Sequence, residues 1–288
     1  MRLAIVAATL SFALAAPNPV SAQTSCGQYN FAVPFAAAFL AGEPFEEASK
    51  AAETITTIAD GACHQDALLK ALKPQLGEVV GYKAAATSEG AQKQLGLDGP
   101  VLGIFLEKML LDSGATVKVD DGARLIFELD LLVRVADPAL GEAQTREEAL
   151  AGIDAVIPFI ELGDLMAAKG AAITGPLVQA MNAGARFGIV GEPIATTGMT
   201  AESLAGSSGQ LLLDGAVVAE APATALLGHP LDAVLWVAQA TNSRGMALKK
   251  GDVLSLGSLG RFQLAAPGVV DATYEFGDLK GAANVTLE

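Results

Sequence analysis

Apolar and polar residues alternate along much of the chain beyond residue 100, and this two-residue period is typical of β-strands with one buried face. The clearest example is RLIFELDLLVRV at 124–135, where apolar residues recur at every second position. A strand is also expected at 77–88, and the Asp-Gly pair at 214–215 predicts a type I′ turn between two later strands. The strands expected beyond residue 100 are 114–120, 123–135, 153–162, 185–191, 208–213, 216–221, 252–257, 261–265 and 269–276.

Helical patterns are fewer, and the longest of them lie before residue 80. Residues 44–60 and 61–75 look helical, and Pro74 is expected to end the second helix. Shorter helices are expected at 88–96, after the capping-box sequence that begins at Thr145, and from Pro230 to residue 243. Many strands with few, dispersed helices predict the α+β class with a large antiparallel or mixed sheet.

Residues 1–22 have the pattern of a secretory signal peptide, with Arg2 before an apolar stretch and small residues at the end. We expect cleavage after Ala22 and a soluble protein that is secreted or periplasmic; a retained membrane anchor is the alternative. No later segment reaches 18 uninterrupted apolar residues. No membrane contact is therefore expected after cleavage.

The chain is acidic, with a formal net charge of −14 and no basic stripe, so nucleic acid and anionic membranes are not expected as partners. Its two cysteines, Cys26 and Cys63, are expected to form one disulfide in an oxidising compartment. A catalytic pair of Cys63 with His64 is the alternative, although adjacent side chains rarely face each other.

Several common catalytic motifs are missing from the sequence. It has no Gly-x-Gly-x-x-Gly after a strand, no P-loop, no zinc-type cluster of Cys and His, and no Gly-x-Ser-x-Gly elbow. Of the two histidines, His229 precedes Pro230 at a helix start, where a structural role is expected. Nucleophilic hydrolysis is therefore disfavoured, and carboxylate chemistry remains.

Glu128 and Asp130 stand one residue apart within the apolar strand 123–135, so both side chains point to the same face. Glu161 ends another apolar strand, 153–162. Three carboxylates from two neighbouring strands form a plausible oxygen cage for Mg²⁺ or a similar hard cation. The alternative is a solvated polar face on which Arg124 and Arg134 flank the acids.

Six segments, in order, resemble blocks of the 2-keto-4-pentenoate hydratase family within the fumarylacetoacetate hydrolase-like superfamily. They are GYKAAATSEGAQKQLGLDGP (81–100), FELD (127–130), PFIELGD (158–164), MNAGARFGIVG (181–191), LGHPLDAVLWVA (227–238) and LKKGDVLSLGSLG (248–260). The resemblance covers roughly residues 54–276. Its order and approximate spacing favour the metal-binding interpretation of the FELD strand.

The resemblance implies a β-roll built around a mixed sheet, with a small helical region before it. We therefore expect a mostly helical region at 23–80 and a hydratase-like β-roll domain at 81–288. Members of the family usually form homo-oligomers, so a homo-oligomer is expected here.

The resemblance also implies metal-assisted chemistry on a small 2-oxo acid: hydration of a 2-oxo-4-enoate, decarboxylation of a related dicarboxylate, or C–C cleavage of an acylpyruvate. Glu128, Asp130 and Glu161 are the expected ligands of a divalent cation, Mg²⁺ or Mn²⁺. Lys83 is expected near the substrate, where its charge would offset the carboxylates; the alternative is a lysine that reaches water from a strand edge. Asn182 is a further candidate for the pocket.

The chain departs from the family pattern at positions that carry polar groups in relatives. Val101 replaces an Asp, Gly184 a Ser and Leu256 a Thr, and a Tyr of the hydratases falls near Ala62, although Gln65 is kept. Each change removes a group that could move a proton or hold substrate. Two hypotheses follow: a hydratase- or decarboxylase-type enzyme, which we favour, and an exported protein that binds a metal and a 2-oxo carboxylate without turnover. A purely structural exported domain is a third.

Overall fold

A computed structural model describes residues 26, 27 and 29–288, so the predicted signal peptide lies outside the described residues. The described part has helices and strands throughout, and none of its helices is both long and apolar enough to cross a membrane. The α-helices are α1 (Ala32–Ala41), α2 (Ala48–Thr54), α3 (Ile58–Leu76), α4 (Glu89–Leu95), α5 (Arg146–Ala151), α6 (Gly175–Ala180), α7 (Ala201–Ala205) and α8 (Pro230–Ser243). Short 3-10 turns are η1 (Glu107–Met109), η2 (Val119–Asp121), η3 (Pro138–Glu142), η4 (Asn182–Gly184) and η5 (Ala223–Ala225).

The strands form two sheets. The larger follows the order β2-β1-β11-β5-β6-β7-β3, with β12 also pairing with β5 and β8 with β6, and the smaller follows β10-β9-β13-β14-β4. Parallel and antiparallel pairs occur in both sheets. The strands are β1 (Val79–Ala85), β2 (Val101–Leu106), β3 (Leu110–Asp112), β4 (Ala115–Val117), β5 (Leu125–Val135), β6 (Ile153–Asp164), β7 (Ala185–Val190), β8 (Ile194–Ala195), β9 (Ser208–Leu213), β10 (Ala216–Pro222), β11 (Val253–Ser255), β12 (Gln263–Leu264), β13 (Gly268–Phe276) and β14 (Leu279–Leu287).

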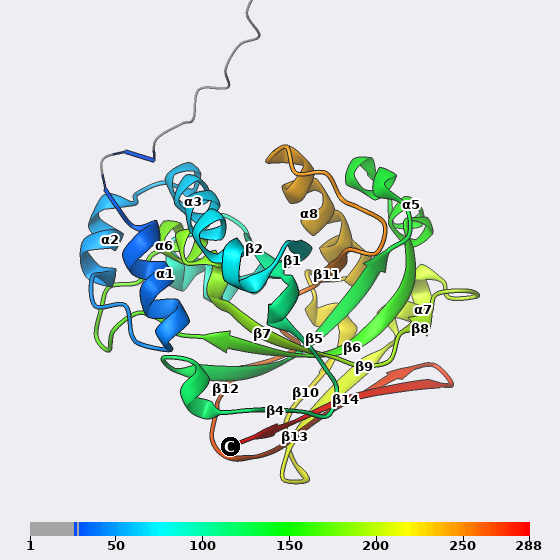
Figure 1. Cartoon of the computed structure of the whole chain (residues 1–288). Helices are drawn as coiled ribbons and strands as arrows, with labels where there is room; N and C mark the ends of the chain where they lie inside the picture. The colour runs from blue at the N-terminus through cyan, green and yellow to red at the C-terminus, as the bar shows by residue number, and fades with distance from the viewer. Residues whose placement is uncertain (1–25, 28) are drawn as a thin grey trace, which may run out of the picture.

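Helices gather at two ends of the larger sheet, with α1, α2, α3 and α6 at one end and α5, α7 and α8 at the other (Figure 1). The smaller sheet packs against β5 and β6, since the Tyr274 hydroxyl on β13 donates to the carbonyl oxygens of Asp130 and Phe159. This arrangement confirms the expected α+β class with a mixed sheet. The predicted division between residues 80 and 81 stays a prediction.

The N-terminal helices differ in their bounds from the sequence-based expectation. Instead of 44–60 and 61–75, the helices are α2 and α3, separated at Ile55–Thr57. Thr57 starts α3 early because it forms a capping box with Asp60. Pro74 does not end α3, which continues to Leu76 and stops before Gly77, whose φ is +88°. Because Pro74 has no N–H to donate to the carbonyl of Lys70, α3 lacks one hydrogen bond there and continues for only two more residues.

The predicted disulfide is confirmed: Cys26 and Cys63 are bonded, with their Cα atoms 5.5 Å apart. The bond ties the described N-terminal segment to α3. Close by, the rings of Phe31, Phe35 and Phe45 pack on one another at centroid distances of 5.0–5.5 Å. These rings are continuous with the core of the sheets, and the disulfide links the N-terminal helices covalently to the segment that precedes them.

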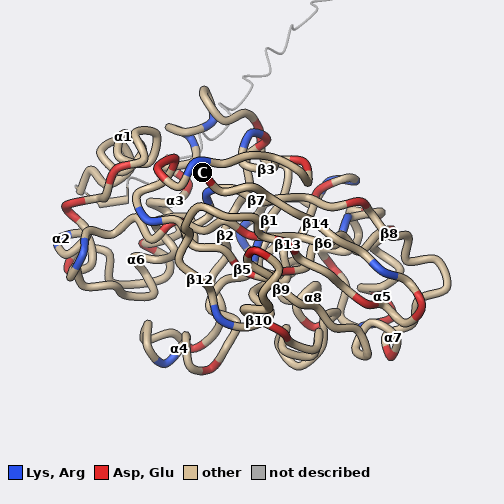
Figure 2. The backbone as a smooth tube through the Cα atoms, turned by 90° about the horizontal axis from the view of Figure 1, so that it is seen from below, with Lys and Arg blue, Asp and Glu red and all other residues tan. Residues whose placement is uncertain are grey.

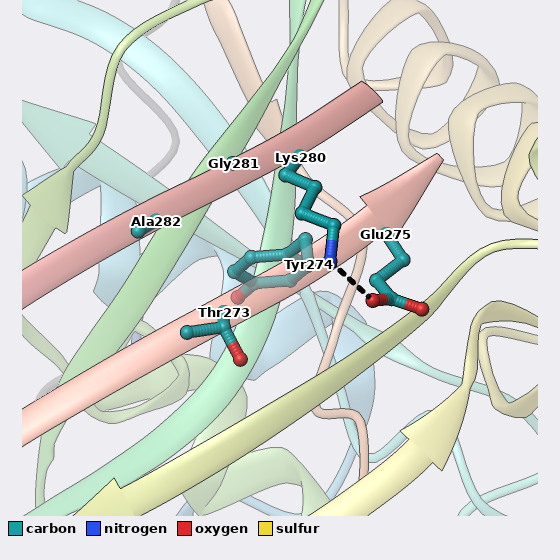
Figure 3. Close-up of a pocket in the computed structure, with 6 residues that line it drawn as sticks. All are labelled: Thr273, Tyr274, Glu275, Lys280, Gly281 and Ala282. Carbon is teal, nitrogen blue, oxygen red and sulfur yellow. Dashed lines mark hydrogen bonds and ion pairs between the residues drawn. The ribbon is translucent and has the colours of Figure 1, made fainter. Parts of the chain in front are cut away.

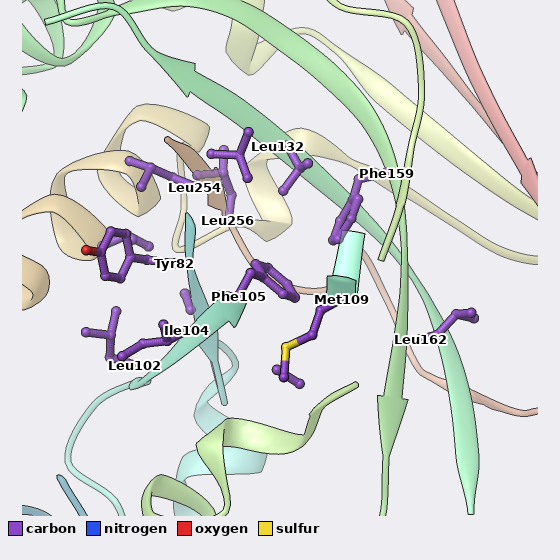
Figure 4. Close-up of a cluster of buried hydrophobic side chains, with 14 of the residues drawn as sticks. Tyr82, Leu102, Ile104, Phe105, Met109, Leu132, Phe159, Leu162, Leu254 and Leu256 are labelled. Carbon is purple, nitrogen blue, oxygen red and sulfur yellow. The ribbon is translucent and has the colours of Figure 1, made fainter. Parts of the chain in front are cut away.

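The main core lies between the sheets and helices, and Figure 4 shows its part around β1, β2 and β11. Strand β2 is not among the strands expected from the sequence, because all six of its residues are buried and alternation is absent. Strand β14, which pairs with β13 along its whole length, is likewise absent from the expected strands. The turn at 214–215 is confirmed by positive φ angles at Asp214 and Gly215, and the capping box at Thr145 is confirmed at the start of α5.

Acidic and basic residues are interspersed along the chain rather than gathered on one face (Figure 2). The arrangement agrees with the absence of a basic stripe in the sequence.

Candidate metal centre and active site

The pairing of β5 with β6 brings two of the predicted metal ligands together. The strands are antiparallel, and their register sets Glu128 directly opposite Glu161 and Asp130 opposite Phe159. Directly opposed residues of an antiparallel pair point to the same side, and like charges in such positions destabilise a sheet. Glu128, Asp130 and Glu161 therefore share one face of the β5–β6 pair, at a cost that calls for a compensating positive charge.

Lys83 supplies one such charge from β1, which is connected to β5 through β11. Its Nζ donates to Glu161 Oε1 and, over 3.2 Å, to the carbonyl oxygen of Ala183. Both charged residues are almost fully buried, with 3% of Lys83 and 2% of Glu161 exposed. The ammonium thus lies inside the protein among the carboxylates and not at a strand edge in water.

Gly103 on β2 opens the path that the Lys83 side chain follows. The two residues are partners across the β1–β2 pair. A Cβ atom at position 103 would lie 2.4 Å from Lys83 Cγ and 3.1 Å from the Ala183 Cβ atom. Any residue with a side chain would therefore collide with the lysine stem, so glycine is required for this placement.

Asp130 is completely buried and its carboxylate is held in one orientation. Its Oδ1 accepts hydrogen bonds from the backbone N–H groups of Leu131 and Gly257, and its Oδ2 accepts from the Ser255 hydroxyl. Glu128 is only half-buried and is the most accessible of the three acids. Asp130 is therefore enclosed by the protein, whereas Glu128 retains some exposure to solvent.

The electrostatics of the cluster disfavour the simultaneous ionisation of its three acids. Burial raises the pKa of Glu128 to about 7, and the Glu161 carboxylate adds to the rise while Lys83 opposes it. Burial, and then Glu161, also raise the pKa of Asp130 well above its ordinary value. Burial alone would lower the pKa of Lys83, but the carboxylates of Glu161, Glu128 and Asp130 outweigh it and leave that pKa raised. One lysine thus does not neutralise three acids.

The donor set and its charge fit a divalent cation, because hard cations take carboxylate oxygens and would offset the excess negative charge. The hydrogen bonds to Asp130 are of the kind that orient ligating carboxylates. Within residues 26, 27 and 29–288, however, no three Asp, Glu, His or Cys side chains lie together in the arrangement of a finished metal site. Glu161 faces Lys83, and Asp130 faces Ser255 and Gly257. The ligand set Glu128, Asp130 and Glu161 therefore stays a prediction.

Asn182, the predicted pocket residue, uses its side-chain amide within the protein. Its Oδ1 accepts from the Ile104 N–H at 2.9 Å and from Gln65 Nε2 at 2.7 Å, and its Nδ2 donates to the Ile104 carbonyl at 2.9 Å. The contacts in the structure are thus with β2 and α3, and a contact with substrate stays a prediction.

Ser255, Gly103 and Tyr274 contribute to the cluster but are not among the site residues expected from the sequence. Ser255 was detectable in principle, as a hydroxyl in an otherwise apolar strand inside a segment that resembles the hydratases. Gly103 and Tyr274 gave no such signal, because their contacts with Lys83 and Asp130 join strands that are distant in sequence.

A surface pocket of about 430 Å³ lies elsewhere, on the β13–β14 hairpin (Figure 3). Its lining includes the exposed ion pair of Lys280 with Glu275. None of its lining residues is among the catalytic, substrate-binding or metal-binding residues predicted from the sequence. We therefore do not take this pocket as the candidate active site.

No protein-family model matches the chain. Among curated proteins, the chain is 28% identical over 239 residues to the 2-hydroxyhexa-2,4-dienoate hydratase of Comamonas testosteroni, covering 79% of this chain and 89% of the relative. It is 29% identical over 194 residues to the 2-keto-4-pentenoate hydratase of Paraburkholderia xenovorans, covering 67% and 70%.

The fold matches that of the 4-oxalocrotonate decarboxylase from Pseudomonas putida G7, solved in complex with magnesium and adipate. The TM-score is 0.76 at 22% identity, and the match covers 88% of this chain and 94% of the decarboxylase. The fumarylpyruvate hydrolase from Pseudomonas aeruginosa also shares the fold, with a TM-score of 0.51 at 11% identity over 73% of this chain and 90% of that chain. The predicted resemblance to the 2-keto-4-pentenoate hydratase family is thus confirmed, and the chain has the fumarylacetoacetate hydrolase-like fold.

Proposed function

We propose that this protein is a metal-dependent lyase of the hydratase or decarboxylase type that acts on a small 2-oxo acid such as a 2-oxo-4-enoate. The observation that carries the proposal is the buried Lys83–Glu161 ion pair on the same face as Glu128 and Asp130. Burying ionised groups is costly, and a cluster of this kind is a recognised mark of functional sites. The similarity to hydratases adds the class of reaction.

We assign Glu128, Asp130 and Glu161 as ligands of a divalent cation, Mg²⁺ or Mn²⁺. A bound cation of this kind supplies Lewis-acid polarisation of a substrate carbonyl. The three acids would hold it from β5 and β6, with Ser255 and the Gly257 N–H keeping Asp130 in place. Glu128 is the most exposed of the three acids.

Lys83 has the complementary task. Three carboxylates and a divalent cation would sum to a charge of −1, and the carboxylate of a 2-oxo acid would make it −2. The Lys83 ammonium offsets that charge and can donate to the oxygen on which charge develops when a proton shifts to give an enolate. Its burial strengthens this interaction because little water competes for the donor.

A second candidate is a binding protein that retains the cation and the 2-oxo carboxylate without turnover. The residues found where this chain departs from the family pattern favour the binding protein. Val101 and Leu256 are buried and apolar, with 2% and 0% exposed, and Gly184 has no side chain. None of them can relay a proton, so turnover would need other groups.

The cation site is tested with Glu128→Gln, which keeps the shape of the residue and removes its charge. We expect the affinity for Mg²⁺ and Mn²⁺, measured by calorimetric titration, to fall at least about tenfold, because second-sphere changes alone cost that much. Glu220→Gln, on the exposed face of β10, is the matched control. An unchanged affinity in Glu128→Gln would show that the ligand assignment is wrong.

Enzyme and binder are separated by incubating the metal-loaded protein with a panel of 2-oxo-4-enoates and acylpyruvates and following ultraviolet absorbance. Loss of the dienoate chromophore supports the lyase. Tight binding of oxalate without any spectral change supports the binder, and absence of both binding and turnover rejects both proposals.

We also infer that the protein is secreted or periplasmic and works as a homo-oligomer. The disulfide is compatible with export, because such bonds persist in oxidising compartments. N-terminal sequencing of the protein recovered from the periplasm or medium tests cleavage after Ala22, and sedimentation equilibrium tests the subunit number.

A further inference from the structure

The Lys83 ammonium has a second partner besides Glu161, and this partner is part of the backbone. Its Nζ lies 3.2 Å from the carbonyl oxygen of Ala183 in η4. A carbonyl cannot rotate freely as a side chain does, so its direction depends on the backbone conformation around residue 183. The position of the ammonium therefore depends on how η4 is held.

The η4 segment has an unfavourable backbone conformation. Asn182, Ala183 and Gly184 have φ angles of +56°, +54° and +70°, all in the left-handed region. Glycine adopts this region readily, whereas alanine does so only when its surroundings impose it. The glycine at position 184, a departure from the family pattern, suits this conformation. The conformation at Ala183 still needs a clamp.

The side chain of Asn182 provides that clamp. Its amide oxygen accepts from the N–H of Ile104 on β2, and its amide nitrogen donates to the carbonyl of the same residue. The Asn182 side chain thus pairs with the edge of the sheet as the backbone of a neighbouring strand would. Its oxygen also accepts from Gln65 Nε2 over 2.7 Å. Asn182 and Gln65 are 3% and 0% exposed, so water does not compete for these hydrogen bonds.

Gln65 is anchored in turn on every side. Its Nε2 also donates to the Leu102 carbonyl at 2.8 Å, and its Oε1 accepts from Gln179 Nε2 at 2.7 Å and from the Arg244 guanidinium. Gln65 lies on α3 only two residues after Cys63, which the disulfide fixes to Cys26. A continuous series of buried hydrogen bonds thus runs from α3 through Asn182 to the backbone that accepts from Lys83.

We propose that Gln65 and Asn182 are positioning residues for Lys83: they hold η4 so that the Ala183 carbonyl and Glu161 fix the ammonium between them. The inference rests on the proposed function for the use that is made of Lys83. It assigns Asn182 a role through the backbone in place of direct contact with substrate, and it gives Gln65 a role that the sequence alone did not indicate.

The first test follows the Lys83 ammonium directly, in full-length protein labelled with ¹⁵N on the lysine side chains. Its signal in lysine-selective NMR spectra is identified by its loss in Lys83→Met. In Gln65→Leu we expect the protons of the Lys83 ammonium to exchange with water at least about tenfold faster. A change of this size corresponds to the loss of roughly one net hydrogen bond. Gln239→Leu is the matched control: Gln239 lies on α8 and donates to the Ala143 carbonyl, and its loss should leave the rate unchanged.

Asn182→Gly provides an independent variant if Gln65→Leu does not fold. Glycine tolerates the positive φ angle, so this change removes the clamp without adding backbone strain. The same acceleration is expected. An exchange rate equal to that of the parent protein in either folded variant would overturn the inference, whether or not the protein binds a metal.

The second test measures oxalate binding to Mg²⁺-loaded protein in a double-mutant cycle. Gln65→Leu should weaken oxalate at least about tenfold in the parent but have no further effect in Lys83→Met, because the glutamine acts through the lysine. Equal losses in both backgrounds would indicate a merely structural role and overturn the inference. If the parent protein binds neither Mg²⁺ nor oxalate, the proposed function fails while the exchange measurement still decides the positioning.

Discussion

Lys83 shows how one side chain depends on the identity of residues far from it in sequence. Its stem passes over Gly103, its ammonium reaches Glu161, and neither relation is apparent from the segment 81–100 alone. Spacing within β5 placed Glu128 and Asp130 on one face, as the sequence analysis expected. The opposing position of Glu161 required the register of β5 with β6.

Gly103→Ala is the sharpest change at this scale. The added Cβ would lie 2.4 Å from Lys83 Cγ, so the lysine must move away from Glu161. We expect a loss of about 1–3 kcal/mol in the free energy of unfolding, as for other overpacked sites, together with loss of oxalate binding. Urea unfolding and calorimetric titration measure the two effects.

Gly90→Ala is the control for this substitution, because a Cβ at that position in α4 meets nothing within 4 Å. It should leave oxalate binding intact. Normal binding by Gly103→Ala would contradict the steric role of the glycine.

At the level of elements, one ion pair joins helix α5 to helix α8. Arg146 at the start of α5 bonds to both carboxylate oxygens of Asp232 in the first turn of α8, at 2.7 and 2.6 Å. The hydrogen bond from Arg146 is the main cause that lowers the pKa of Asp232. The pair thus links two helices on the side of the molecule opposite α1–α3 (Figure 1).

A lowered pKa in the folded state means that ionised Asp232 stabilises the fold above its unfolded pKa of about 3.9 and that this contribution disappears as the pH falls through the folded pKa. Asp232→Asn should therefore destabilise the protein at pH 7 but have progressively less effect below about pH 4. Because both side chains are partly exposed, the effect should also shrink in high salt. Thermal unfolding across pH measures it; a destabilisation that does not change with pH would contradict the assignment.

The whole molecule combines a sheet-rich body with an N-terminal helical region that the Cys26–Cys63 disulfide ties to its preceding segment. The bond closes a loop with a sequence separation of 37 residues. In the chain-entropy model a loop of this length contributes about 3–4 kcal/mol to stability.

Replacing both cysteines by serine should therefore lower the free energy of unfolding by about 3–4 kcal/mol. Urea unfolding measures the loss, and a reducing agent should destabilise the parent protein but not the double variant. Equal stability of parent and variant would show that the bond does not contribute. The positioning role of Gln65 adds an expectation at the same scale: oxalate binding should weaken in the variant as α3 loosens.

Local sequence determined the features that depend on neighbouring residues. Alternation predicted most strands, the Asp-Gly pair at 214–215 predicted its turn, and Thr145 predicted the start of α5. The paired cysteines predicted their disulfide. Six segments in order were enough to identify the resemblance to the hydratases, since the spacing of short motifs survives where overall identity falls to 28–29%.

Only the tertiary structure decided what depends on contacts between distant segments. The fully buried strand β2 has no alternation to detect, and α3 continues two residues beyond Pro74 before it ends at Gly77. The residues that neighbour Asn182 in sequence do not indicate that its amide binds β2 or that Gln65 lies beside that amide. Periodicity is set by the direction of each side chain from its own backbone, whereas the site is set by which strands pair and in which register.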